Sequence, residues 1–206
     1  MKKPPSEGII TLDLNESPVS LQAKAERRKL LKDKIQEKIA GVEYLLSGDI
    51  KVSITWFIHE QKRYETSHTA DIDNIIKPIL DSLCGRSGVM IDDNQIQRVT
   101  SEWFDTKSPE EERLEININF QPDEFLPKEE LFFVHIRNNL YLPLWENLPK
   151  KCQQEIITQY SNMLKLRDSL QDAGMEYYRS SCFLPAQRVF HKNRLGEFTL
   201  KEIDQV

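Results

Sequence analysis

Residues 69–83 read Thr-Ala-Asp-Ile-Asp-Asn-Ile-Ile-Lys-Pro-Ile-Leu-Asp-Ser-Leu, and residues 89–96 read Val-Met-Ile-Asp-Asp-Asn-Gln-Ile. The apolar positions of the first stretch recur with the period of a helix, so we predict a helix from near Ile72 to Leu83 that ends before Gly85. The second stretch leads from an apolar triple into a predicted strand. A helix with one apolar face beside a strand is typical of a domain in which helices pack on a sheet.

Pro78 lies past the first turn of this predicted helix. Proline has no backbone N–H to donate, and its ring crowds the preceding turn of a helix. We therefore expect either a kink at Pro78 or a helix that starts as late as Asn74.

The segments on either side complete a mixed fold. Alternating apolar residues predict strands, a helical period with Ser20 as its cap and Gly41 as its end predicts a helix, and polar composition predicts a loop. The strands are predicted at 9–14, 49–59, 95–105 and 113–120, the helix at 21–40 and the loop at 60–70. The order β-α-β-α-β-β indicates an α/β (α+β) domain with a compact mixed sheet.

The spacing of apolar residues changes after residue 122. The run Gln121-Pro122-Asp123 interrupts the strands, and helices are predicted at 129–138 and 150–171. We therefore expect two domains, residues 1–122 and residues 123–206. The second is predicted to be a mainly helical C-terminal extension of unknown role, through which a protein partner could bind.

Pairs of carboxylates lie at the start and at the end of residues 71–93. Asp71 and Asp73 are two residues apart at the start of the predicted helix, where extended backbone points both side chains the same way. Two adjacent carboxylates repel each other unless a positive charge lies between them. Asp92 and Asp93 can supply a third carboxylate at the strand entrance. Such an all-oxygen set suits a hard cation such as Mg²⁺, for which Mn²⁺ is a possible substitute.

Lys77 follows Asp73 by four residues and precedes Asp81 by four, so all three share one face of the predicted helix. An ammonium group one turn from metal-binding carboxylates can stabilise a phosphate or a developing oxyanion. The chemistry that fits this set is hydrolysis of a phosphodiester, in which metal-activated water attacks phosphorus.

Each of these residues also has a structural interpretation. Asp71 alone is compatible with a plain helix N-cap, and Asp92-Asp93-Asn94 is compatible with a turn. Lys77 with Asp73 and Asp81 is compatible with a solvated ladder of ion pairs. The combination of all of them around one amphipathic helix favours the functional interpretation.

Composition narrows the class of protein. With 28 Lys and Arg against 33 Asp and Glu, the net charge is −5, which gives no general attraction to nucleic acid. DNA binding would therefore depend on local cations, for which we select Lys24, Arg27, Arg28, Lys62 and Arg63. Three scattered cysteines without C-x-x-C spacing argue against a zinc site. No apolar run is long enough to span a membrane, so a cytoplasmic protein is expected.

The run D-I-D-N-x-x-K-x-x-x-D-x-L followed by D-D-x-Q-I resembles the RusA family of Holliday junction resolvases, over roughly residues 10–121. The resemblance implies that Asp71, Asp73 and Asp93 are catalytic carboxylates that bind metal and that Lys77 is the catalytic lysine. Asp92, as a further candidate ligand, and Asp81 match acidic positions close to the site. The resemblance also implies a magnesium-dependent endodeoxyribonuclease that acts as a homodimer on branched DNA.

The predicted function is therefore Mg²⁺-dependent resolution of four-way DNA junctions by paired phosphodiester hydrolysis, in DNA recombination or repair. One alternative is a non-cleaving module that binds branched DNA or protein through the C-terminal extension. The acidic net charge and the extension itself motivate that alternative. Another is a different phosphoryl-transfer enzyme, although the polar residues before Asp71 differ from the apolar strand that precedes D-x-D in phosphatases.

Overall fold

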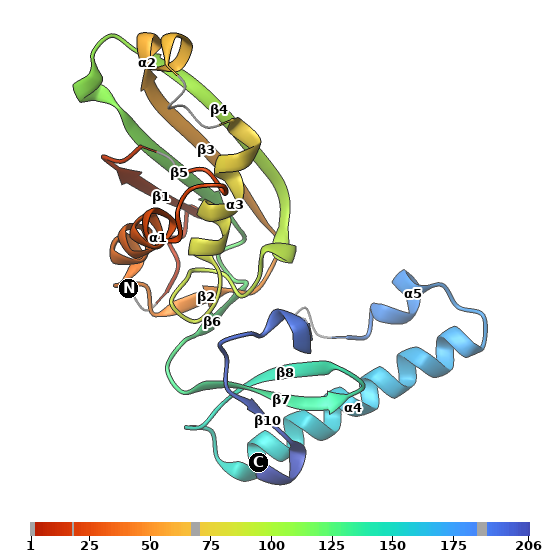
Figure 1. Cartoon of the computed structure of the whole chain (residues 1–206). Helices are drawn as coiled ribbons and strands as arrows, with labels where there is room; N and C mark the ends of the chain where they lie inside the picture. Colours follow the sequence, from red (N-terminus) through yellow and green to blue (C-terminus); the bar gives the residue numbers. More distant parts are fainter. Residues whose placement is uncertain (1–2, 18, 67–70, 185–188) are drawn as a thin grey trace. The chain divides into compact units, whose positions relative to one another are not determined.

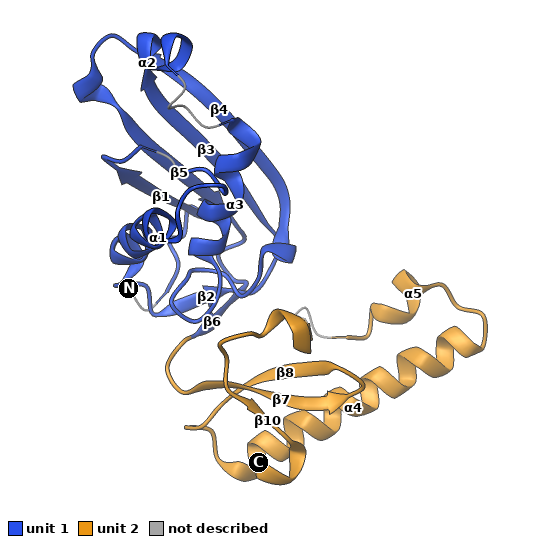
Figure 2. Cartoon of the chain, viewed as in Figure 1, with its two compact units in different colours: residues 1–127 blue, residues 128–206 orange. Residues whose placement is uncertain are grey.

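The computed structural model describes residues 3–17, 19–66, 71–184 and 189–206. The chain divides into two compact units, residues 1–127 and residues 128–206 (Figure 2). Residues 123–127 group with the first unit because β6 (Phe125–Pro127) pairs with β2 (Tyr44–Leu46) in an antiparallel ribbon. Both units combine helices and strands, so the predicted α+β class is confirmed.

A four-stranded mixed sheet organises the first unit (Figure 1). Its strands are β1 (Ile9–Leu14), β3 (Ile50–His59), β4 (Ile96–Thr106) and β5 (Arg113–Asn119), in the order β1-β5-β3-β4. β3 and β4 run parallel, and the other two pairs are antiparallel. The four strands predicted from alternating apolar residues are thereby confirmed, each within a residue of its predicted start.

One face of this sheet carries the core of the unit. The even-numbered residues of β3, from Ile50 to Ile58, are buried and alternate with partly exposed ones. Helices α1 (Ala25–Ile39) and α3 (Ile72–Leu83) pack on that face, with Leu31, Ile35 and Ile79 in one cluster with the strand residues. The helical period of the sequence therefore orients each helix by its apolar side.

Helix α3 begins at Ile72 and includes Pro78, so a start as late as Asn74 is wrong. The proline leaves the carbonyl of Asn74 without its usual helical donor four residues on. The backbone N–H of Leu21 donates to that carbonyl at 2.7 Å. Pro78 thus leaves an acceptor free, through which the segment before α1 is tied to the first turn of α3.

Two local predictions in the first unit are wrong. The helix predicted from residue 21 begins only at Ala25, with Lys24 at its N-cap. The predicted loop 60–70 contains helix α2 (Glu60–Glu65), which buries no residue and so has no apolar period to reveal it.

The second unit is a small sheet with a long helix rather than a set of helices. Its strands are β7 (Leu131–Arg137), β8 (Leu140–Trp145), β9 (Phe190–His191) and β10 (Leu200–Lys201), and its helices are α4 (Lys150–Asp172) and α5 (Tyr177–Ser181). The helix predicted at 150–171 is confirmed, whereas the one predicted at 129–138 is wrong because that segment forms β7. Phe132, Leu142 and Leu144 pack against Ile157 and Leu164 of α4.

Short 3₁₀ turns complete the structure: η1 (Asp93–Gln95), η2 (Pro109–Glu111), η3 (Lys192–Arg194) and η4 (Ile203–Gln205). No helix within the described ranges is both long and apolar enough to cross a bilayer.

Candidate active site

Asp71 and Asp73 lie at the start of α3. Asp71 occupies the N-cap position in extended backbone, with φ −63° and ψ 145°, but its side chain makes no capping hydrogen bond. Both residues are exposed, and neither carboxylate is in an ion pair with another described residue. The interpretation of Asp71 as only a capping side chain is therefore not supported. Its carboxylate is available for another role.

Asp93 is held by the turn η1, immediately before β4. Asp92 caps this turn, because its Oδ1 accepts a hydrogen bond from the N–H of Asn94 at 3.0 Å. The buried Gln95 closes the turn from the other side: its Oε1 accepts from the N–H groups of Ile91 and Asp92. Asp92 thus has the structural role that turn chemistry predicts, and the turn presents Asp93 beside α3.

Gln95 is the positioning residue that sequence reasoning missed. Its Nε2 donates to the carbonyls of Leu46 and Gly48, at 2.8 and 3.0 Å. One buried amide therefore fastens the turn before β4 to the end of β2 and to the residues that follow it. The only signal in the sequence was the glutamine in D-D-x-Q-I, and its partners lie almost fifty residues away.

Lys77 joins the two halves of the sequence motif. Its Nζ is 2.7 Å from Oδ2 of Asp93 and 2.7 Å from Oδ1 of Asp81. The hydrogen bonds that Lys77 donates to these two carboxylates, that of Asp81 first, raise the pKa of Lys77 above its usual value. The ammonium therefore stays charged at physiological pH. Of the predicted ladder of ion pairs, the pair between Lys77 and Asp81 is observed. The bond to Asp93 shows that Lys77 also links α3 to the turn η1.

The pKa of Cys84, the C-cap residue of α3, reflects both its burial and the carboxylates around it. Burial, followed by the nearby charges of Asp93, Asp92 and Asp81, raises the pKa of the Cys84 thiol to about 12. A protonated thiol is a poor nucleophile. The donors that the sequence motif brings to this site are the carboxylate oxygens of its aspartates.

The carboxylates do not form a ready metal site in this arrangement. Within the described part of the chain, no three of the His, Cys, Asp and Glu side chains are grouped so that they could hold an ion. Asp71 precedes Lys77 by six residues, a rise of about 9 Å along a helix, whereas Lys77 touches Asp93 directly. The chemistry of the donors suits Mg²⁺, but Asp71, Asp73 and Asp93 would have to converge to share one ion.

The five cations selected for DNA binding fall into two groups. Lys24, Arg27 and Arg28 lie at the exposed start of α1. Lys62 and Arg63 lie on α2, where they form ion pairs with Glu112 and Asp105 respectively. The charges of Lys62 and Arg63 are thus largely balanced, which makes these two residues weaker candidates for DNA binding.

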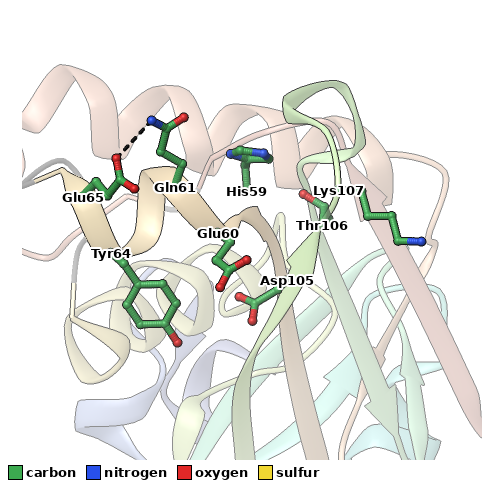
Figure 3. A pocket seen from close by; sticks show the side chains of 8 residues that line it. All are labelled: His59, Glu60, Gln61, Tyr64, Glu65, Asp105, Thr106 and Lys107. Atoms are coloured by element: carbon green, nitrogen blue, oxygen red, sulfur yellow. Dashed lines mark hydrogen bonds between the residues drawn. The ribbon is translucent and has the colours of Figure 1, made fainter.

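A hollow of about 610 Å³ lies beside α2, between the ends of β3 and β4 (Figure 3). Glu60, Glu65 and Asp105 contribute carboxylates to its lining, against one cation, Lys107. Such an acidic lining disfavours a phosphate group. The hollow also lacks any of the predicted catalytic residues.

The comparison with protein families relates the part of the chain that carries this site to a class of enzyme, the endodeoxyribonucleases. Residues 19–119, from the segment before α1 to the end of β5, match the model of the family described as endodeoxyribonuclease RusA. This part of the chain is similar to the RusA family, and it includes Asp71, Asp73, Lys77 and Asp93. No family covers the remainder, and no curated protein matches the chain.

Proposed function

We propose that the protein is a Mg²⁺-dependent endodeoxyribonuclease that resolves four-way DNA junctions. The observation that carries this proposal is the contact between Lys77 of α3 and Asp93 of the turn η1. It unites the two halves of the motif that the RusA family match spans. We further propose roles in DNA recombination or repair and a cytoplasmic location.

In this proposal Asp71, Asp73 and Asp93 hold the ion, with Asp92 and Asp81 close by. The ion, when bound, would polarise the phosphodiester and activate a water molecule. Lys77 would place a permanent positive charge beside the phosphate. Its bonds to Asp81 and Asp93 fix the ammonium before substrate arrives, so little reorganisation is needed.

The test is cleavage of a synthetic four-way junction with Mg²⁺ by the full chain and by Asp73→Asn. We expect the variant to lose most activity, because one charged donor of the ion becomes neutral. Asp172→Asn, which removes one exposed carboxylate from α4, is the matched control and should cut like wild type. Chelation should abolish cleavage, and Mn²⁺ should restore it. Equal cleavage by wild type and Asp73→Asn would refute the enzymatic proposal.

We also propose that the protein acts as a homodimer, so that two sites nick two strands. Strand β4 supports this proposal: it forms an edge of the main sheet over eleven residues, all of them at least partly exposed. Exposed edges of this length tend to pair with another strand. Sedimentation equilibrium should give twice the mass of one chain, and a monomer at working concentration would contradict this part.

A non-cleaving DNA-binding module is the rival outcome of the same experiment. It would be favoured by a gel shift with the junction and no cleavage with any divalent metal. In the described second unit, Tyr177, Tyr178 and Phe183 are exposed aromatic side chains to which a protein partner could bind.

A further inference from the structure

Helices α1 and α3 line a hollow of about 190 Å³ beside the ion-paired residues Lys77 and Asp81. Arg28, Lys29 and Lys32 contribute the side of α1, and Pro78, Asp81 and Ser82 contribute the side of α3. Asp81 is also the residue that holds Lys77, at 2.7 Å. The hollow and the candidate active site therefore share a residue.

The cations of this hollow are not engaged in ion pairs within the described part of the chain. Arg28, Lys29 and Lys32 form no ion pair with a described residue, whereas Lys34 of the same helix is paired with Glu16. The only carboxylate in the lining is that of Asp81, which is paired with Lys77, so the three cations outnumber it. Three cations against one carboxylate around a concave surface produce a local positive potential on a chain of negative net charge.

Resting on the proposed function, we propose that this hollow binds a phosphate of the DNA backbone next to the phosphodiester that is cut. Its volume is below the range of pockets that enclose a whole small molecule, so it suits one charged group at the surface of a longer chain. The hydroxyl of Ser82 already donates to the carbonyl of Pro78 at 2.6 Å. In this proposal the phosphate is therefore bound by the three cations.

The surrounding residues favour a nucleic acid strand as the source of that phosphate. Leu21, which is 42% exposed, and Pro78 give the hollow an apolar part, against which a deoxyribose can lie. The hydrogen bond from Leu21 to Asn74 fixes this apolar part to α3. The acidic hollow beside α2 (Figure 3) offers no such combination.

A contact of this kind positions the strand without reading its sequence. Loss of the three cations should therefore weaken binding of a junction and of a linear duplex by similar factors. It should also reduce the salt dependence, because each lost phosphate contact lowers the slope of log K against log salt by about 0.9 on duplex DNA.

The test measures DNA binding by the full chain without divalent metal, as a function of salt concentration. For the triple variant Arg28→Gln, Lys29→Gln, Lys32→Gln we expect the slope to fall by about 0.9, because the hollow contacts one phosphate, and for Lys32→Gln we expect a smaller fall in the same direction. Lys38→Gln, in the last turn of α1 and outside the hollow, is the matched control and should keep the wild-type slope. Circular dichroism should show all variants folded, since none of the three residues is buried.

The outcomes separate this inference from the proposed function. If wild type cuts the junction and the folded triple variant keeps the wild-type slope and affinity, the hollow is not the phosphate site, and the proposed function stands. If wild type neither binds nor cuts the junction, both proposals fail together. If the triple variant and Lys38→Gln weaken binding equally, the effect is one of general charge, and the assignment to the hollow is wrong.

Discussion

Lys77 is the residue whose replacement we expect to affect activity most directly. Replacing it by Met removes the ammonium that Asp81 and Asp93 hold and leaves those two carboxylates without their shared counter-charge. We expect Lys77→Met to lower the single-turnover rate of junction cleavage by about 10²–10³, as for loss of one preorganised electrostatic donor. Lys77→Arg keeps the charge and should retain more activity. A wild-type rate for Lys77→Met would show that the lysine is structural.

Asp168 gives the second unit a defined response to acid. Hydrogen bonds first from Arg137 and then from Arg167 lower the pKa of Asp168 to about 2. A carboxyl group whose pKa is lowered by folding stabilises the folded state above its unfolded pKa, near 4. That contribution is lost as the pH falls toward the folded value, between about pH 4 and pH 2. Because the side chain is 39% exposed, solvent screening limits the contribution to about 1 kcal/mol.

The measurement is thermal unfolding of wild type and Asp168→Asn across this range. Above pH 5 the variant should melt a few degrees lower, and the difference should vanish near pH 2. Asp172→Asn on the same helix is the control and should show no such convergence. A difference that stays constant down to pH 2 would mean that ionisation of Asp168 is not the cause.

At the scale of elements, the turn η1 depends on one buried side chain. Gln95→Ala leaves two N–H groups and two carbonyls without their partner, and unsatisfied buried groups cost about 1–3 kcal/mol each. We therefore expect a clear loss of stability together with a lower kcat, because Asp93 loses its support. Gln97→Ala, at an exposed position of β4, is the comparison.

Gln95→Glu separates positioning from simple unfolding. It keeps the acceptor for Ile91 and Asp92 but loses the donor to Leu46 and Gly48. At a temperature where both variants are folded, kcat should recover further in Gln95→Glu than in Gln95→Ala, with little change in KM. If both variants keep the wild-type kcat while folded, the turn does not position Asp93 for catalysis.

The same elements show what the sequence could and could not predict. Strand β3 was predictable because one face is buried and the other is not, so apolar residues alternate. Strand β7 was not, because Leu131 to Val134 are all buried, and a continuous apolar run has no period that distinguishes strand from helix. In the site, Lys77 and its carboxylates were recognisable from local spacing. The hollow between α1 and α3 was not, since its two sides are some fifty residues apart in the sequence.

At the scale of the whole molecule, the two units have separate cores and should be separable, provided that the cut respects β6. Leu126 is 2% exposed, and Phe125 meets the ring of Tyr44 at 6.0 Å. A chain of residues 1–127 should therefore melt cooperatively, whereas a chain of residues 1–122 should lose about 2 kcal/mol or more with the burial of Leu126. Equal melting of the two truncated chains would show that β6 contributes nothing to the first unit.

Cleavage by the chain of residues 1–127 then assigns a role to the second unit. All the candidate catalytic residues lie in the first unit, so we expect this chain to retain cleavage. Rates on a four-way junction and on a linear duplex of the same sequence should be compared with those of the full chain. Loss of the preference for the junction would place recognition of branched DNA in residues 128–206, because the chemical step would be intact. An unchanged preference would place that recognition in the family-matched part, and complete loss of cleavage by the folded truncated chain would contradict the expectation.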